Sequence, residues 1–245
     1  WHPLGDPFRG TGGNHIQSVR SQSGGRFFRT ILSVAFPSDR EEVIFQHSTL
    51  GALLVGLYEG DLRFDRLLQR GDFGVGTFQG VDGELVVLDG QAYRIRVDGV
   101  ASEVEGSTLT PFAVVTFFEP DITFELAAVD SFESLQEQID AMLPSDNLLY
   151  AIQVNGVFSQ LTTRSVPAQD RPYPGLADVV AEQTTFDFEN IEGTMVGFRL
   201  PSYLSGINAT GYHFHFIDQA RQTGGHVLGF SATNLKVEID VSKRL

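Results

Sequence analysis

Apolar and polar residues alternate over much of the chain after residue 72, which is the period of a half-buried β-strand. The segment GTFQGVDGELVVLDGQAYRIRVDGVASEV, residues 76–104, breaks into short apolar runs separated by Asp-Gly pairs. Because Asp-Gly between alternating runs is a strong β-hairpin signal, this segment predicts an antiparallel meander. The continuous apolar run PFAVVTFFE, residues 111–119, predicts a strand that is buried on both faces.

Helical spacing is clearest in SFESLQEQIDAM, residues 131–142. Its first serine is a candidate N-cap, an acidic residue follows in the first turn, and apolar residues recur every three or four positions. Residues 50–57, preceded by the candidate cap Thr49, predict a short helix. Residues 62–70 predict another, which ends at Gly71.

The second half of the chain returns to strand-like segments. Residues 148–164 predict two strands joined by an Asn-Gly turn, and residues 233–241 predict an edge or closing strand. The segment DRPYPG, residues 170–175, predicts a loop and a domain junction. Residues 83–93 and 193–203 match in spacing without a gap, which suggests an internal duplication.

Together these patterns predict an α/β protein of the α+β type, built from two related mixed β-sheet domains with a few short helices. The N-terminal domain is expected at residues 27–172 and the C-terminal domain at residues 173–245. Residues 1–26 are rich in Gly, Ser, Asn and Gln, and we expect them to form a loose N-terminal arm.

The composition is typical of a folded, strand-rich protein. Hydrophobic residues make up 42% of the chain and charged residues 20%, with 26 glycines and 20 phenylalanines, a mix that favours strands and tight turns. The formal net charge of −14 argues against a nucleic-acid partner, because phosphate binding needs clustered Lys and Arg.

The absence of cysteine excludes disulfides and thiolate metal sites. No apolar run approaches the length of a membrane span, so we expect no membrane association. The chain begins at Trp1 rather than at Met, which indicates a processed or engineered start. We therefore expect a soluble protein that is either cytoplasmic or secreted after removal of a signal peptide.

The segment GYHFHFIDQARQTGGHVLGF, residues 211–230, carries three of the chain's six histidines. In a strand, the imidazoles of His213 and His215 would point to one face and the flanking aromatic side chains to the other. The polar residues that follow end in Gly-Gly and predict a hairpin connection, after which His226 opens a second apolar run. Antiparallel pairing of the two strands would bring His226 close to the other two histidines.

Three neutral imidazoles on one sheet face would form a catalytic-type site for zinc or a similar divalent metal, with a fourth position open for water or substrate. Imidazole also suits Cu, Ni, Mn and Fe, so these residues do not identify the metal. The alternative interpretation is a set of surface histidines on a solvated face. His47 precedes a candidate helix cap in an apolar run and is expected to be a satisfied core histidine, not a ligand.

Six segments resemble the acetolactate decarboxylase family, in order along the chain: HSTLGALLVGLYEGDL, GDFGVGTFQGVDGELVVLDGQAY, PFAVVTFF, TTRSVPAQDRPY, GTMVGFRLPSYLSGINATGYHFHFI and RQTGGHVLGF. The resemblance covers about residues 40–232. It implies a two-domain enzyme, usually a homodimer, that converts 2-acetolactate to acetoin and carbon dioxide on the way to butanediol.

The resemblance also implies roles for particular residues. The family's zinc ligands fall on His213, His215 and His226. Its active-site glutamate falls on Glu84 and its active-site arginine on Arg164.

Two further positions follow from the same resemblance. Thr77 matches a polar residue of the family's pocket. The family also uses a second glutamate from its C-terminal tail, to which no residue of this sequence is assigned. Glu238 is the only late glutamate, and we expect it to be an ordinary strand residue.

Decarboxylation of a 2-hydroxy-3-keto acid releases an electron pair, which the adjacent ketone accepts to give an enediolate. A divalent metal bound by the hydroxyl and ketone oxygens acts as a Lewis acid for that charge, so no organic cofactor is required. In this hypothesis Arg164 grips a carboxylate or enediolate oxygen. Glu84 accepts the hydroxyl proton or orients a bound water, and then helps to deliver a proton to carbon. Spacing alone would favour a surface arginine and a solvated turn glutamate at these positions.

Two alternatives from other classes remain at this point. HxH with a later histidine also occurs in cupin-like metal oxygenases, although those usually have a glutamate about four residues after HxH, and none is present here. The second alternative is a non-catalytic, sheet-rich binding protein in which a metal stabilises the fold.

Overall fold

The computed structural model describes residues 2–3, 8–9, 15–20, 26–31 and 43–245. The chain divides into two compact units, Trp1–Glu41 and Glu42–Leu245. In the first unit, the central strand β3 (His15–Arg20) pairs antiparallel with three others: β1 (His2–Pro3), β2 (Phe8–Arg9) and β4 (Arg26–Ile31). The loose arm expected over residues 1–26 lies partly outside the described residues and stays a prediction.

The second unit contains a six-stranded sheet in the order β10-β9-β8-β7-β12-β5. Its strands are β5 (Phe45–His47), β7 (Phe73–Thr77), β8 (Glu84–Leu88), β9 (Gln91–Ile95), β10 (Ala101–Glu103) and β12 (Ala113–Thr116). The predicted meander is confirmed as β7 to β10, and Gly90 and Gly99 in its Asp-Gly turns have positive φ. β6 (Leu62–Arg63) and β11 (Leu109–Thr110) form a separate pair.

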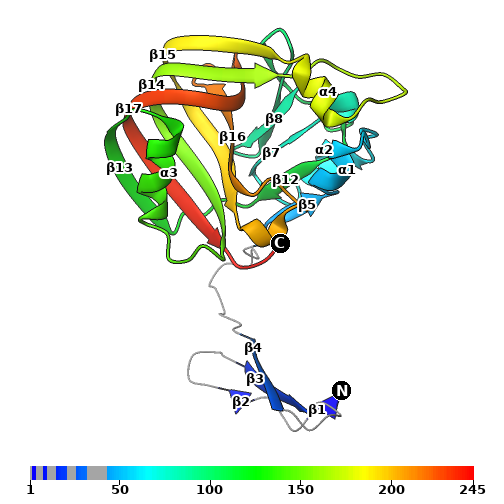
Figure 1. Ribbon diagram of the computed structural model, residues 1–245, viewed down its shortest axis with the longest axis vertical. Helices are drawn as coiled ribbons and strands as arrows, with labels where there is room; N and C mark the ends of the chain where they lie inside the picture. The colour runs from blue at the N-terminus through cyan, green and yellow to red at the C-terminus, as the bar shows by residue number, and fades with distance from the viewer. Residues whose placement is uncertain (1, 4–7, 10–14, 21–25, 32–42) are drawn as a thin grey trace. The chain divides into compact units, whose positions relative to one another are not determined.

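A five-stranded sheet follows in the order β13-β17-β14-β15-β16 (Figure 1). Its strands are β13 (Ile122–Val129), β14 (Leu149–Ser165), β15 (Thr184–Leu200), β16 (Gly211–Asp218) and β17 (Gly224–Ser242). The start of β17 also pairs with β16, so β14, β15, β16 and β17 close into a ring. The segment 233–241, expected as an edge or closing strand, is the far part of β17, which lies between β13 and β14 and is therefore not an edge.

The expectation of mixed sheets was wrong. All pairs between the named strands of the described residues are antiparallel. Two parallel strands need a long crossover connection between them, usually a helix, whereas antiparallel strands can be joined by short turns. The longest helix in the described residues has only 9 residues.

Four short helices accompany the sheets: α1 (Leu50–Leu54), α2 (Phe64–Leu67), α3 (Phe132–Asp140) and α4 (Leu176–Ala181). The predicted helix at 131–142 is confirmed as α3, in which Ser131 Oγ accepts a hydrogen bond from Ser134 N at 3.2 Å. Thr49 caps α1 in the same way. Figure 1 shows α3 against the five-stranded sheet, and α1 and α4 beside the six-stranded sheet. No helix in the described part of the chain is long and apolar enough to cross a membrane.

The Asn-Gly pair in β14 does not form the expected turn. β14 runs straight through it, and Asn155 Oδ1 accepts a hydrogen bond from Thr194 Oγ1 on β15 at 2.8 Å. A β-bulge against β17 occurs between Asn155 and Val157. A Cβ at Gly156 would lie 2.5 Å from Leu235 Cδ2 and 3.1 Å from the Asn234 carbonyl oxygen, so this glycine lies where β17 packs closely against β14 and not in a turn.

The expected boundary between residues 172 and 173 falls between strands of one sheet. β14 precedes it and pairs with β15 and β17, which follow it. The strand pairing therefore does not confirm the two-domain division, which stays a prediction. The two segments that suggested a duplication also differ in structure. Residues 83–93 contain the β8–β9 hairpin, whereas residues 193–203 contain the end of β15 and the start of a 3₁₀ turn, Ser202–Leu204.

The two large sheets share one hydrophobic core. Val75 and Val86 of the six-stranded sheet lie in the same buried cluster as Val196, Phe198 and Ile217 of the five-stranded sheet. Burial of such apolar surface between sheets is the main favourable contribution to folding. Residues that point from either sheet toward this cluster therefore meet between the sheets.

Candidate metal centre

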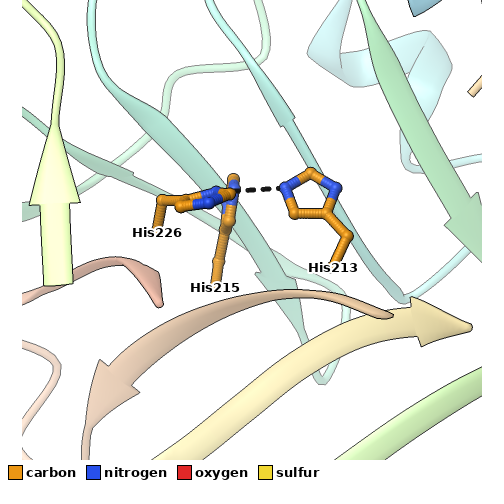
Figure 2. Close-up of side chains that lie close together, drawn as sticks. All are labelled: His213, His215 and His226. Carbon is orange, nitrogen blue, oxygen red and sulfur yellow. Dashed lines mark hydrogen bonds between the residues drawn. The ribbon is translucent and has the colours of Figure 1, made fainter. Parts of the chain in front are cut away.

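The three histidines lie on β16 and β17, and they converge as the sequence pattern predicts. His215 and His226 are directly opposite each other in the ladder. His213 Nε2 lies 3.2 Å from His226 Nδ1, and Figure 2 shows the three rings gathered together. The flanking Phe214 and Phe216 point the other way, into a separate core cluster, which confirms the predicted alternation.

The ring of strands adds an arginine to this group. The residue His226 pairs with His215 on β16 and also with Arg164 on β14. The three residues therefore form one row across neighbouring strands. Arg164 and the histidines line a cavity of about 270 Å³, together with Thr77 and Glu84 from the six-stranded sheet.

The His215 ring is held by a backbone group of the facing sheet. His215 Nδ1 lies 2.7 Å from the Leu85 carbonyl oxygen on β8. Since a carbonyl only accepts, Nδ1 donates, and Nε2 keeps its lone pair. That Nε2 is buried and has no hydrogen-bond partner among the described residues. A buried acceptor without a hydrogen-bond partner destabilises the fold, so this nitrogen is suited to bind a metal ion or another ligand.

The donor set fits a divalent metal. The ligand atoms of His213, His215 and His226 lie within 4.8 Å of one another, and His213 Nε2 is 3.2 Å from His226 Nδ1. Tetrahedral zinc with Zn–N bonds of about 2.0–2.1 Å needs neighbouring nitrogens about 3.4 Å apart. The second ring nitrogen of His215 is fixed by a carbonyl, as is usual for metal-bound imidazole.

Burial keeps the three imidazoles neutral. It lowers the pKa of His213 to about 4, with a further contribution from the positive charge of Arg164. Burial, then the neighbouring histidines, lowers the pKa of His226 well below its usual value, and His215 shifts in the same direction. Neutral imidazole is the form that binds metals, so little proton competition is expected near neutral pH.

Glu84 begins β8 and faces the five-stranded sheet. Its side chain is buried, and Oε2 lies 3.4 Å from His215 Nε2. Burial raises the pKa of Glu84 to about 7, although the nearby Arg164 charge acts in the opposite direction. Thr77 is opposite Glu84 in the β7–β8 pair, and its hydroxyl donates to the Gly83 carbonyl at 2.8 Å.

Arg164 lines the same cavity as Glu84 and carries a positive charge. Within residues 43–245 its side chain has no hydrogen bond or ion pair. It nevertheless depresses the pKa values of Glu84 and of the histidines by its charge. An arginine fork that is open toward a cavity can receive a carboxylate or another oxyanion.

Sequence reasoning did not anticipate the apolar part of the cavity wall. It comes from α1, from α4 and from neighbouring segments: Leu50, Leu53, Val81, Phe112, Val166, Leu176 and Val180. Isolated leucines and valines carry no sequence signal for such a role. The Leu85 carbonyl was also missed, because a main-chain contact cannot be inferred from residue type.

Two residues expected to lie outside the site do so. Glu238 lies in β17 and pairs with Lys236 at 2.7 Å. His47 is only half-buried, so it is not the core histidine that was expected, and its Nε2 lies 2.6 Å from Asp61 Oδ1. It lines a different, larger cavity of about 1020 Å³.

The lowered histidine pKa values predict that the metal-free protein loses stability in mild acid. Below about pH 6.5 the unfolded chain binds protons that the folded site excludes, and for His213 this continues to about pH 4. Glu84 has the opposite sign, because its raised pKa stabilises the fold at low pH and that contribution is lost as the pH rises through about 7. Between about pH 6.5 and 4.5 the three histidines change the free energy of unfolding more than the one glutamate does. Each proton that only one of the two states binds changes this free energy by about 1.4 kcal/mol per pH unit.

Urea unfolding of the metal-free protein at pH 7 and pH 5 measures this effect. We expect a lower free energy of unfolding at pH 5, and a smaller drop for the His213→Asn variant, which has one excluded proton fewer. Equal pH slopes for the two proteins would contradict the prediction.

Fold and site together have the features of one class of protein, sheet-rich α+β enzymes that can hold a divalent metal by imidazoles. A sequence profile described as alpha-acetolactate decarboxylase matches residues 44–245. The chain belongs to the alpha-acetolactate decarboxylase family, whose members are carboxy-lyases.

Individual relatives agree with this assignment. The chain is 47% identical over 205 residues to an alpha-acetolactate decarboxylase of Methanosarcina mazei, covering 84% of this chain and 71% of the relative. It is 44% identical over 196 residues to that of Bacillus subtilis, covering 80% and 77%. The crystal structure of alpha-acetolactate decarboxylase from Bacillus subtilis strain 168 superimposes with a TM-score of 0.80 at 42% identity, covering 82% and 86%. The resemblance seen in the sequence is therefore confirmed.

Proposed function

We propose that this protein decarboxylates 2-acetolactate to acetoin and carbon dioxide with the help of a divalent metal. One observation carries the proposal, the convergence of His213, His215 and His226 with Glu84 and Arg164 on a single cavity. The names of the related proteins support the choice of substrate. Neither the cupin-like oxygenase nor the non-catalytic binding protein has comparable support.

The cavity has a charged side and an apolar side that suit a small keto acid. Arg164 offers a cation for the substrate carboxylate. Leu53 and Val166 lie on the apolar part of the wall, where the two methyl groups of 2-acetolactate can pack. A volume of about 270 Å³ excludes much larger substrates.

The reaction breaks the bond between the carboxylate carbon and the carbon that bears the hydroxyl. The electron pair of that bond moves into the adjacent ketone, carbon dioxide leaves, and an enediolate remains. Protonation of the former carboxylate-bearing carbon gives acetoin. The substrate's own ketone is the electron sink, so the proposal includes no organic cofactor.

Glu84 is suited to the proton transfers. Burial raises its pKa to about 7 in the metal-free site, and a bound divalent cation would lower it again, so Glu84 would be the carboxylate that accepts a proton and later returns it. Arg164 is permanently charged, so it can hold the substrate carboxylate out of the carbonyl plane and then stabilise the negative charge on oxygen. The Leu85 carbonyl keeps the His215 ring in a fixed orientation while these changes occur.

His213, His215 and His226 would hold the metal. When bound, a divalent ion would supply Lewis-acid stabilisation of the charge that develops on the substrate oxygens. Zinc is the proposed ion, although imidazole also accepts other divalent metals. A homodimer, suggested by the family resemblance, remains a prediction.

Removal and return of the metal test the proposal. We expect protein treated with a chelator and then desalted to form acetoin from racemic acetolactate at no more than about 1% of the untreated rate, and zinc to restore the activity. Magnesium is the matched control, because it prefers oxygen ligands and should restore little. Full activity without metal would refute metal dependence. An untreated, zinc-loaded protein that forms no acetoin would refute the decarboxylation itself.

A further inference from the structure

Asp82 lies two residues before Glu84, in the turn that leads into β8. The carboxylate of Asp82 receives hydrogen bonds from two arginines on or next to the neighbouring strand β9. Arg94 Nη1 donates at 3.0 Å, and Arg96 donates through Nε at 3.0 Å and Nη2 at 2.9 Å. The Asp82 side chain is 24% exposed and that of Arg94 only 20%, so this ion pair is better shielded than most on the surface.

The turn holds one non-glycine residue, Val81, in a conformation that its side chain does not favour. Gly80, Val81 and Gly83 all have positive φ, at 67°, 49° and 97°. Positive φ is rare for a β-branched residue such as Val81, so surrounding contacts must hold it there. A Cβ at Gly83 would lie 2.4 Å from the Ile95 carbonyl oxygen, which shows how tightly the turn lies against β9.

Each end of the turn is fixed separately. At the start, Gly80 N donates to the Tyr58 carbonyl at 2.9 Å, and Gly80 O accepts from Gln169 N at 2.7 Å. At the end, the Thr77 hydroxyl donates to the Gly83 carbonyl. Between them, the Asp82 carboxylate is the only side chain of the turn with a hydrogen bond or ion pair in the described residues.

We infer that Asp82 is a positioning residue for Glu84. This inference rests on the proposed function of Glu84 in the reaction. The ion pairs of Asp82 with Arg94 and Arg96 hold the strained turn against β9. The position of the turn then determines the direction of the Glu84 side chain, because Glu84 is the first residue of β8. The Glu84 carboxylate thereby stays 3.4 Å from His215 Nε2. Asp82 itself is not among the residues that line the cavity.

The chain contains a matched control for this inference. A second Asp-Gly turn, Asp89-Gly90, lies at the other end of the same strand. The Asp89 side chain is 83% exposed, and its nearest cation, Arg221, is 3.9 Å away. Comparison of Asp82→Asn with Asp89→Asn therefore separates the loss of the two arginine ion pairs from the general effect of losing an aspartate in a turn.

We expect Asp82→Asn to lower kcat by about tenfold, because small displacements of a catalytic group are costly, with KM and bound zinc unchanged. Asp89→Asn should behave as the wild type. In a Glu84→Gln background, Asp82→Asn should cause no further loss, since its effect passes through Glu84. An unchanged kcat, or an equal loss in both backgrounds, would overturn the inference.

Two further measurements keep the test decisive. A crystal structure of the zinc-loaded Asp82→Asn protein should show Glu84 Oε2 displaced from its wild-type position, whether or not the protein forms acetoin. An unmoved Glu84 would overturn the inference, whereas an inactive wild type would refute only the proposed function. If Asp82→Asn does not fold, Arg96→Lys takes its place, because lysine keeps the positive charge but lacks the forked guanidinium group. This variant should show the same pattern, and a wild-type kcat in it would overturn the inference.

Discussion

Replacement of His215 by asparagine is expected to abolish metal retention and to lower acetoin formation by about 10³-fold or more. The size of the effect follows from the several kcal/mol that a Lewis-acid metal contributes to transition-state stabilisation, at 1.36 kcal/mol for each factor of ten. His215 is 1% exposed and lies at the centre of the site, opposite His226 and next to Glu84. Two remaining imidazoles would leave the ion without a stable set of protein ligands.

His47→Asn is the control for this variant. His47 is a partly buried histidine that pairs with Asp61 and lines another cavity, so zinc content and turnover should stay at wild-type levels. Metal analysis after gel filtration and an acetoin assay measure both effects, and circular dichroism checks the fold. A His215→Asn protein that keeps one zinc per chain would show that the metal is not bound by this trio.

Glu84→Gln is expected to keep the metal and to lower kcat by about 10²- to 10⁴-fold, the usual contribution of a general acid–base residue. Glutamine has nearly the same shape but cannot accept and return a proton. It also removes the buried carboxylate whose pKa is raised to about 7, so the folded protein should be no less stable near neutral pH. Loss of turnover would then reflect chemistry and not unfolding.

Glu238→Gln provides the comparison. Glu238 is a strand glutamate on β17 paired with Lys236, well outside the cavity lining, and its replacement should leave kcat unchanged. Steady-state kinetics with 2-acetolactate and zinc analysis on the same samples distinguish the two variants. Normal turnover by the Glu84→Gln protein would remove Glu84 from the mechanism.

Local patterns predicted the parts of the fold that depend on neighbouring residues. The Asp-Gly meander and the capped helix α3 are confirmed, because turn chemistry and helix caps act over a few positions. The Asn-Gly pair in β14 misled the same reasoning. Its glycine packs closely against Leu235 on a strand that is distant in the sequence, and that contact cannot be read from the local sequence.

The site divides in the same way. Alternation in β16 and the hairpin to β17 place His213, His215 and His226 together, and both effects are local. Nothing local indicates that Arg164 joins them. It does so because the start of β17 pairs with both β14 and β16.

The sequence by itself therefore determined the identity of the imidazole trio and, through resemblance, the family. Only the tertiary structure decided what surrounds the trio. The contact between His215 and the Leu85 carbonyl joins residues 130 positions apart, and Glu84 reaches the histidines from the facing sheet. Such contacts arise when two sheets pack over a shared core, and the same burial shifts the pKa values of Glu84 and the histidines.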